Sequence, residues 1–365
     1  MNDRGEVVDK VEQLLKELTE ASGVPGNESE IRRIMARELK GKVDDIQYDK
    51  MGSIMGVKNG TSEDPRVLIV GHMDEVGFMV KEITDEGFIK FLPLGGWWGH
   101  VALAQRVRIM TSKGPVLGVI GSKPPHIITP EERKNVIEIK DMFIDVGAQE
   151  KFDVVKKLGI RIGDPIIPVS SFEVLGNKKA YMAKAFDNRA ACGVVLEVIN
   201  GLQRRKHPNT VLAAASVQEE VGLRGAQTLA QLADADVGII VDTSIAQDVP
   251  PGNFKKPERL GNGPSVLVLD ATMIPNQQLR DLVIDTAEKK KIPYHLTSMD
   301  RGGTDGGRVH ISRIGVPSIV IGPPVRYLHS HNAIMSRTDY DNTIKLVTEL
   351  VAVFDKKTVA SFTEA

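Results

Sequence analysis

The chain contains little of what several common functions require. Its single cysteine, Cys192, among 365 residues excludes an internal disulfide and any metal site built from several thiolates. The net charge is only −1, so no overall field attracts nucleic acid or anionic lipid, and neither is expected as a partner. No apolar run approaches the roughly 18 residues of a membrane span. The polar N-terminus resembles no signal peptide, so the expected location is cytoplasmic.

The length of the chain and a change in its pattern of apolar residues predict more than one structural unit. A chain of 365 residues is long for a single hydrophobic core. From about residue 75 to 167 helical periodicity nearly vanishes, and short alternating runs separated by Gly and Pro replace it. This pattern predicts an inserted β-rich barrel or sandwich over residues 74–167. The main domain would then comprise residues 1–73 and 168–365.

Outside the insert, apolar strand-like runs alternate with amphipathic helical segments. This alternation predicts an α/β fold with a mostly parallel sheet flanked by helices. Near the N-terminus, Asn27 followed by Glu30 predicts a capping box at the start of a second helix. In sheets of this kind ligands bind beyond the carboxyl ends of the strands, so polar side chains at those ends are the candidates for a site.

Acidic and imidazole side chains occur where expected elements end in turns. The six are His72, Asp187, Glu219, Glu220, Asp242 and His329. They offer oxygen and imidazole ligands, no thiolate and one carboxylate to spare, which is the composition of a two-metal hydrolytic site. Since strand ends of a parallel sheet share one edge, we expect the side chains that follow the apolar strands to form one site.

One of these side chains, Asp187, admits a second interpretation. An aspartate at a helix entry commonly caps the helix, so Asp187 by itself fits capping as well as it fits a carboxylate that bridges two cations. Of the adjacent Glu219 and Glu220, one can bind a metal while the other takes a proton from water. Asp74 lies two residues after His72 and, on an extended chain, points the same way, so it is placed to orient the imidazole.

Two further features of the sequence bear on the candidate site. His331 competes with His329 for the role of ligand. The GGTDGG stretch at 302–307 looks like a phosphate cradle but lacks the Lys-Ser/Thr of a P-loop, so we expect a turn that shapes the site.

The motifs GHMDEVGFMV, KAFDNRAACGV, VQEEVGLRGA, VDT and RYLHSH, with GVIGSKPPHI in the insert, resemble the M42 aminopeptidases, also called tetrahedral aminopeptidases. The resemblance covers essentially the whole chain. It implies a zinc-peptidase α/β domain that carries a β-rich dimerisation domain, with dimers that assemble into a tetrahedral shell of twelve subunits.

The resemblance also implies two sets of metal ligands that share Asp187. One set comprises His72, Asp187 and Asp242, and the other comprises Asp187, Glu220 and His329. The family often has His-Ser-Pro where this chain has His-Ser-His, and the first of the two histidines is the expected ligand.

By the same resemblance, Glu219 is the general base and Asp74 is the partner of His72. The implied reaction is the release of N-terminal residues from short peptides that have a free N-terminus. Two divalent ions per subunit are expected: zinc first, with cobalt or manganese also compatible, because mixed oxygen and nitrogen ligands bind all three. The preferred N-terminal side chain, whether acidic, basic or neutral, is left open.

Two other functions remain open at this point. A related two-metal deacylase or carboxypeptidase would need a cationic group to bind a substrate carboxylate, for which the candidates are Arg189, Arg224, Arg301 and Arg308. The chain could instead be a metal-stabilised oligomeric scaffold without activity. The spare Glu219 argues against a scaffold, because a purely structural metal site is closed and needs no free base.

Overall fold

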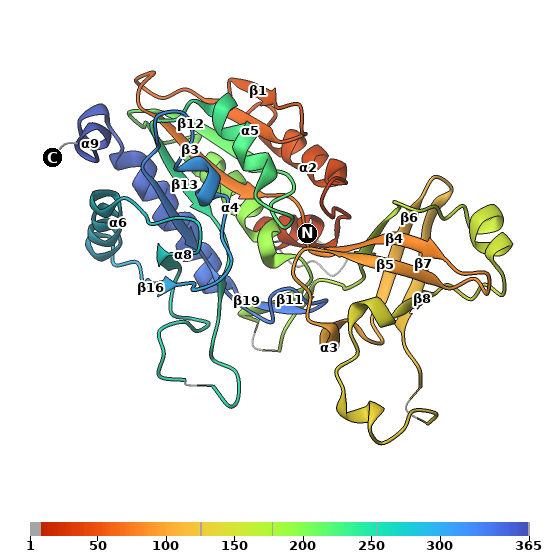
Figure 1. Cartoon of the computed structure of the whole chain (residues 1–365). Coiled ribbons are helices and arrows are strands. Elements are labelled where there is room, and N and C mark those ends of the chain that lie inside the picture. Colours follow the sequence, from red (N-terminus) through yellow and green to blue (C-terminus); the bar gives the residue numbers. More distant parts are fainter. Residues whose placement is uncertain (1–8, 125, 177, 253, 364–365) are drawn as a thin grey trace.

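The computed structural model describes residues 9–124, 126–176, 178–252 and 254–363. The N-terminal residues 1–8, part of the stretch expected to hold no signal peptide, lie outside this description. Figure 1 shows two bodies, an α/β layer structure and a β barrel beside it. The predicted α/β class with an inserted β-rich unit is confirmed.

The α/β body is built on an eight-stranded sheet with a parallel centre. The strands lie in the order β1 (Asp45–Tyr48), β2 (Ile54–Lys58), β12 (Thr210–Ser216), β3 (Arg66–His72), β13 (Val237–Val241), β17 (Ser318–Gly322), β15 (Ser265–Leu269) and β16 (His295–Ser298). Strands β12, β3, β13 and β17 are parallel to one another. These strands are almost wholly buried, which explains why they appear in the sequence as continuous apolar runs.

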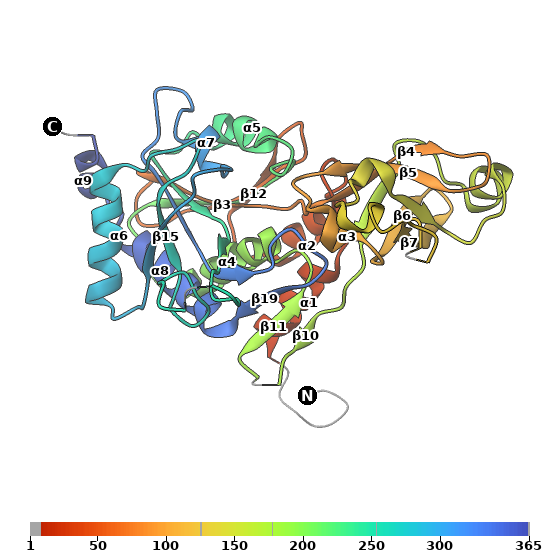
Figure 2. The same cartoon turned by 60° about the horizontal axis from the view of Figure 1, so that its bottom comes forward.

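Helices cover both faces of this sheet. They are α1 (Lys10–Glu20), α2 (Ser29–Leu39), α4 (Phe186–Leu202), α6 (Gln277–Lys289), α8 (Arg337–Val353) and α9 (Lys356–Ser361) on one face, and α5 (Arg224–Ala233) and α7 (Gly306–Val309) on the other. In strand β3, Val67 and Ile69 pack into the first core and Leu68 and Val70 into the second, as strand alternation requires. Figure 2 shows α5 and α7 on the opposite side of the sheet from α4 and α8.

The expected capping box at the start of α2 is wrong. The helix begins at Ser29, and Glu28 occupies the N-cap position without a side-chain capping hydrogen bond. The carboxylate of Glu30 instead accepts the backbone N–H of Ser22 at 2.9 Å. A tertiary contact with the end of α1 therefore uses the side chain that the local pattern assigned to the cap.

The second body is a closed six-stranded barrel. Its strands follow the order β4 (Gly77–Ile83), β5 (Ile89–Leu94), β8 (Phe143–Asp145), β7 (Gly114–Gly121), β6 (Arg106–Thr111) and β9 (Pro165–Pro168). Short helical segments join them: α3 (Gly99–Ala102), η1 (Glu132–Lys134), η2 (Ile139–Asp141) and η3 (Asp153–Leu158). The barrel has an apolar core of its own, which includes Phe78 and Ile109.

A small five-stranded sheet, which the sequence analysis did not predict, lies beneath α1 and α4. Its order is β10 (Glu173–Val174), β11 (Ala180–Ala183), β19 (Ala333–Ser336), β18 (Pro324–Arg326) and β14 (Ser244–Ile245). Figure 2 shows β10, β11 and β19 beside α1, along the lower side of the α/β body. The loop between β18 and β19 carries His329, so this sheet determines where that side chain lies.

Among the residues described, none of the helices has the length and apolar character needed to cross a membrane.

Candidate metal centre

Three neighbouring parallel strands bring polar side chains to one edge of the large sheet. His72 is the last residue of β3, and Asp242 directly follows β13. Glu219 follows the end of β12 by three residues. Because β12, β3 and β13 are adjacent and parallel, their carboxyl ends meet, and the structure brings these three side chains close together.

The imidazole of His72 lies at the centre of a first group of carboxylates. Its Nε2 atom is 3.2 Å from Asp187 Oδ1, 3.9 Å from Glu219 Oε2 and 3.9 Å from Asp242 Oδ1. Ligand atoms of His72, Glu219 and Asp242 all lie within 4.8 Å of one another. By distance alone, Glu219 is therefore close enough to bind an ion together with this imidazole.

A second group forms around the other oxygen of Asp187. His329 Nε2 is 3.3 Å from Asp187 Oδ2 and 3.5 Å from Glu220 Oε2. Ligand atoms of His72, Asp187 and Glu220 also lie within 4.8 Å of one another. Asp187 thus contacts the two imidazoles with its two oxygens, and a carboxylate placed in this way could hold two cations at once.

The local backbone explains why Asp187 faces the two imidazoles and does not cap a helix. Asp187 lies in the first turn of α4, but its φ/ψ of −82°/102° are not helical, and no side-chain cap is formed there. Ala185, two residues before Asp187, has a φ of +56°, a conformation that residues other than glycine rarely adopt and that occurs often at functional sites. The neighbouring Asn188 donates its side-chain N–H to Val241 O at 2.9 Å, which ties α4 to the strand that leads to Asp242.

The buried carboxylates carry more negative charge than the protein neutralises. Burial, together with neighbouring carboxylates, raises the pKa of Glu219 and Asp242 well above their ordinary values and that of Glu220 to about 8. Burial lowers the pKa of His72, but Glu219 and Asp187 outweigh it and raise this pKa. Without a cation, the cluster therefore holds protons that a metal ion would displace.

The donor set fits divalent cations. It consists of carboxylate oxygens and imidazole nitrogens, the ligands that zinc, cobalt and manganese share. Within the described ranges, the buried Oε1 atom of Glu220 has no hydrogen-bond partner. An unpaired buried carboxylate oxygen is costly, and coordination to a cation would remove that cost.

Asp74 holds the backbone of the glutamate pair. Its two carboxylate oxygens accept the N–H groups of Glu219 and Glu220, each at 3.0 Å. The Nδ1 atom of His72 lies 3.6 Å from Asp74 Oδ1 and 3.1 Å from the Asp74 backbone carbonyl. Asp74 therefore contacts His72 through its main chain and also positions both glutamates, a second role that the H-x-D spacing did not indicate.

Glu28 completes this support and was missed in the sequence. Its Oε1 atom accepts the N–H of Gln218 at 3.2 Å and that of Gly26 at 2.7 Å, and the residue is only 6% exposed. Three consecutive N–H groups, at residues 218–220, are thus bound by buried carboxylates. No local pattern indicated Glu28, since it contacts a loop 190 residues away.

His331 lies apart from the two groups. Its Nε2 atom is 3.2 Å from Arg106 O of the barrel, and its ring is 5.5 Å from that of Trp97. Burial lowers the pKa of His331 to about 4, whereas the carboxylates around His329 raise the pKa of that residue to about 9 despite its partial burial. Of the two histidines, His329 is the one that faces Asp187 and Glu220.

Asp305, in the GGTDGG stretch, lies behind the site. It is buried, it accepts a hydrogen bond from the hydroxyl of Ser216 at the end of β12, and burial raises its pKa to about 6. Thr304 donates to Asp270 at 3.1 Å. Side-chain hydrogen bonds therefore tie this stretch to neighbouring elements, and its last two glycines begin helix α7.

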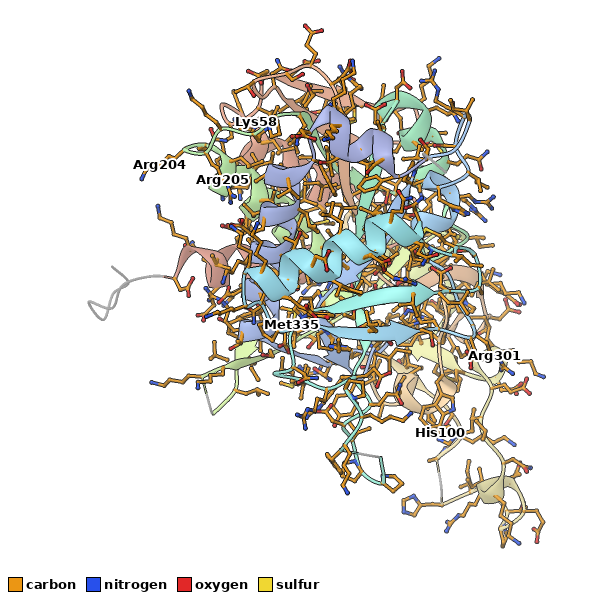
Figure 3. The ribbon with its side chains drawn as sticks, turned by 90° about the vertical axis from the view of Figure 1, so that its left-hand side faces the viewer. Lys58, His100, Arg204, Arg205, Arg301 and Met335 are labelled. Carbon is orange, nitrogen blue, oxygen red and sulfur yellow. The ribbon has the colours of Figure 1, made fainter. Side chains whose placement is uncertain are left out.

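The arginines considered for binding a substrate carboxylate differ in their surroundings. Arg189 is fully buried and donates to the backbone carbonyls of Met73, Leu18 and Gly23, so it cannot bind a substrate. Arg224 contacts Gln218, and Arg301 and Arg308 are exposed. Figure 3 shows Arg301 far from the group of Lys58, Arg204 and Arg205.

Comparison with known proteins gives consistent matches over the whole fold. The family model described as M42 glutamyl aminopeptidase matches residues 52–346, and a model named AMPT matches residues 9–35. The chain is 39% identical to the putative aminopeptidase FrvX of Escherichia coli, covering 96% of this chain and 98% of the relative. It is 35% identical to the glutamyl aminopeptidase of Lactococcus lactis (92% and 93% covered) and 32% identical to the lysyl aminopeptidase of Pyrococcus furiosus (93% and 96%).

Solved structures agree with these matches. A TET aminopeptidase from the marine sediment archaeon Thaumarchaeota archaeon SCGC AB-539-E09 superposes with a TM-score of 0.94 at 45% identity, covering 98% of this chain and all of that one. The TET1 peptidase of Pyrococcus horikoshii, described as assembling into a tetrahedron or a large octahedral shell, gives a TM-score of 0.84 at 30% identity, with 94% and 100% covered.

Proposed function

The chain belongs to the M42 glutamyl aminopeptidase family and is therefore a peptide hydrolase, and from this premise we propose that it is a dinuclear metal-dependent aminopeptidase. It would remove N-terminal residues from short peptides that have a free N-terminus. The observation that carries the proposal is the single carboxylate of Asp187 placed between the two imidazoles of His72 and His329. That family membership also confirms the resemblance found in the sequence.

The proposed ligands form two sets around this bridge. His72, Asp187 and Asp242 would hold one ion, and Asp187, Glu220 and His329 would hold the other. Glu219 lies near the first set, but Glu220 is the glutamate that contacts His329 directly. This division leaves Glu219 as the carboxylate available for proton transfer.

The chain's own residues then perform the acid–base steps. When bound, two divalent ions would lower the pKa of water and polarise the substrate carbonyl. Glu219 would take a proton from the attacking water on its carboxylate and pass it to the leaving amine nitrogen. Asp74 would keep the carboxylate in place by binding the Glu219 N–H.

The central test is the substitution Glu219→Gln, with metal content measured alongside activity. We expect kcat/KM to fall by about 10²–10⁴-fold, because the amide cannot accept the proton. The content of two ions per chain should remain. Glu138→Gln, on the exposed surface of the barrel, is the control and should change neither quantity. Near-normal turnover of Glu219→Gln would remove Glu219 from its proposed role.

Metal identity and substrate class are tested together. Zinc, cobalt or manganese is added back to metal-depleted protein, which is then assayed on aminoacyl amides and on their N-acylated counterparts. We expect zinc to support activity. Cleavage of only the free-amine substrates supports an aminopeptidase, and cleavage of the acylated ones would support the related deacylase. Glutamyl, lysyl and leucyl substrates all belong in the panel, because two relatives are named for different N-terminal residues.

We further propose self-association, with residues 74–167 as the dimerisation domain and residues 1–73 and 168–365 as the peptidase domain. Exposed apolar side chains on the outside of the barrel support this role, namely Leu92, Leu117 and Val119. The expected assembly is a tetrahedral dodecamer, whose mass measured by light scattering would be twelve times the 39.9 kDa of one chain. A pure scaffold would instead dissociate on chelation and cleave no peptide with any metal.

A further inference from the structure

The turn after strand β5 returns from the barrel to the metal centre. The backbone carbonyl of Gly96 lies 2.7 Å from the Nδ1 atom of His329, although 233 residues separate the two in sequence. A carbonyl oxygen can only accept a hydrogen bond, so the Nδ1 atom must carry the hydrogen. In a neutral ring this leaves Nε2 with a free lone pair, and Nε2 is the atom that faces Asp187 and Glu220.

The same turn has no room for side chains. A Cβ atom on Gly96 would lie 3.2 Å from His329 Nδ1. A Cβ atom on Gly95 would lie 3.1 Å from Glu220 Oε2 and 2.6 Å from a methyl group of Val76, and the φ of Gly95 is +85°. Both glycines therefore allow the barrel backbone to approach residues of the second proposed ion site.

Neighbouring aromatic side chains hold the turn in place. Trp97 donates its indole N–H to Gly77 O at 3.1 Å and stacks on Phe78 with ring centroids 4.6 Å apart. His331 also contacts the barrel, at Arg106 O, and its ring lies 5.5 Å from that of Trp97. The loop that carries His329 is thus attached to the barrel at two points two residues apart.

We propose that the barrel acts as a positioning element for the second ion, with the Gly96 carbonyl fixing the tautomer and the orientation of His329. This inference depends on the proposed function, because it requires that His329 binds an ion. Partners that orient a metal-binding imidazole commonly change metal affinity by about 10–100-fold when they are disturbed. The barrel would then contribute to catalysis within its own chain, apart from any role in assembly.

The test compares Gly96→Ala with Gly176→Ala in the full-length chain. Gly176 has open space around its Cβ position and a φ outside the positive range, so its alanine variant controls for the substitution itself. Metal-depleted proteins are titrated with zinc by calorimetry, and bound zinc is counted after dialysis. We expect wild type and Gly176→Ala to bind two ions. Gly96→Ala should bind the first ion normally and the second about 10–100-fold more weakly.

The outcomes separate this inference from the function on which it rests. If Gly96→Ala binds both ions as wild type does, or loses both equally, the positioning role is overturned. If wild type itself binds fewer than two ions or cleaves no free-amine peptide, the proposed function fails whatever Gly96 does. Should Gly96→Ala not fold, Trp97→Phe decides, because it removes the donor to Gly77 without adding an atom near His329. Unchanged second-ion affinity in that variant would overturn the inference.

Discussion

At the scale of single residues, the site depends on carboxylates that bind backbone N–H groups as well as on those that face the imidazoles. Asp74 and Glu28 are acceptors for the segment 218–220, and both are almost fully buried. Their charge adds to the electrostatic cost of the buried cluster, yet without them consecutive amide groups of a half-buried loop would lack protein partners. Such groups are expensive to leave unpaired.

Asp74→Asn should therefore weaken both the fold and the reaction. The amide has one acceptor oxygen, so one of the two N–H groups, of Glu219 or Glu220, faces an NH₂ group instead. We expect a loss of about 1–3 kcal/mol in the free energy of unfolding, measured by urea denaturation, together with a lower kcat/KM. Asp85→Asn, at a fully exposed aspartate, should change neither. Wild-type stability of Asp74→Asn would contradict the role assigned to these two hydrogen bonds.

The stability of the metal-free protein should fall as pH rises. Burial and the nearby charge of Asp187 raise the pKa of Glu220 from 4.5 to about 8, so the folded state binds this proton more tightly than the unfolded state. Stability from Glu220 is then complete below pH 4.5 and is lost between pH 4.5 and 8, by at most about 1.4 kcal/mol per pH unit. The raised pKa of His329, about 9, acts in the same direction between pH 6.5 and 9.

Urea denaturation of metal-free protein between pH 5 and 9 measures this slope. Glu220→Gln should flatten it, and Glu138→Gln, on the surface, should leave it unchanged. Zinc should oppose the decline, because metals bind the deprotonated ligands. A metal-free protein that gains stability over this range would contradict the charge balance described for the cluster.

At the scale of elements, the site needs α4 to pack closely on β3, because one carries Asp187 and the other His72. Gly71, next to His72, allows this approach: a Cβ atom there would collide with the side chain of Ala191 on α4. Glycine is thus a packing requirement of a helix on a strand at this position.

Gly71→Ala should separate the two elements. We expect the free energy of unfolding to fall by about 1–3 kcal/mol from overpacking, and zinc affinity to fall with it because Asp187 moves relative to His72. Gly201→Ala, near the end of the same helix, meets only ordinary contacts with Thr348 and should be neutral or slightly stabilising. Equal effects of the two substitutions, measured by thermal unfolding and zinc titration, would contradict the packing argument.

At the scale of the whole molecule, the barrel has a closed core but an apolar outer surface. Leu117 and Val119 are 58% and 41% exposed, whereas Gly118 and Ile120 between and beside them are buried. Alternation along β7 therefore places Leu117 and Val119 on the outer surface of the barrel. Packing within the chain does not explain why these two exposed side chains are apolar. This row fits an interface between copies of the chain.

Leu117→Glu should reduce the assembled mass, measured by light scattering, because a charge would be buried in the dimer contact. Leu296→Glu, on the edge strand β16 of the other body, is the comparison, since Leu296 is also exposed, at 44%. We expect a clear loss of mass only for the barrel variant, with circular dichroism unchanged in both. Loss of assembly for Leu296→Glu alone would place the interface away from the barrel.

The sequence by itself determined the features that depend on local periodicity and on strand order. Continuous apolar runs identified the buried strands, alternating runs predicted an inserted β-rich barrel or sandwich, and the parallel order predicted that His72, Glu219 and Asp242 would meet at one edge. These predictions succeed because burial patterns and strand ends are properties of short segments.

Only the tertiary structure decided which partners these residues have. Three of these contacts join residues that are up to 233 positions apart in the chain. They are the contact of His329, and not His331, with the carboxylates, the two amides bound by Asp74, and the contact of Gly96 with His329. The capping box of α2 fails for a more local reason, because the carboxylate of Glu30 accepts the N–H of Ser22 in the turn just before the helix. A contact between distant segments leaves no periodic signal in either of them, so it becomes visible only once the cores have brought those segments together.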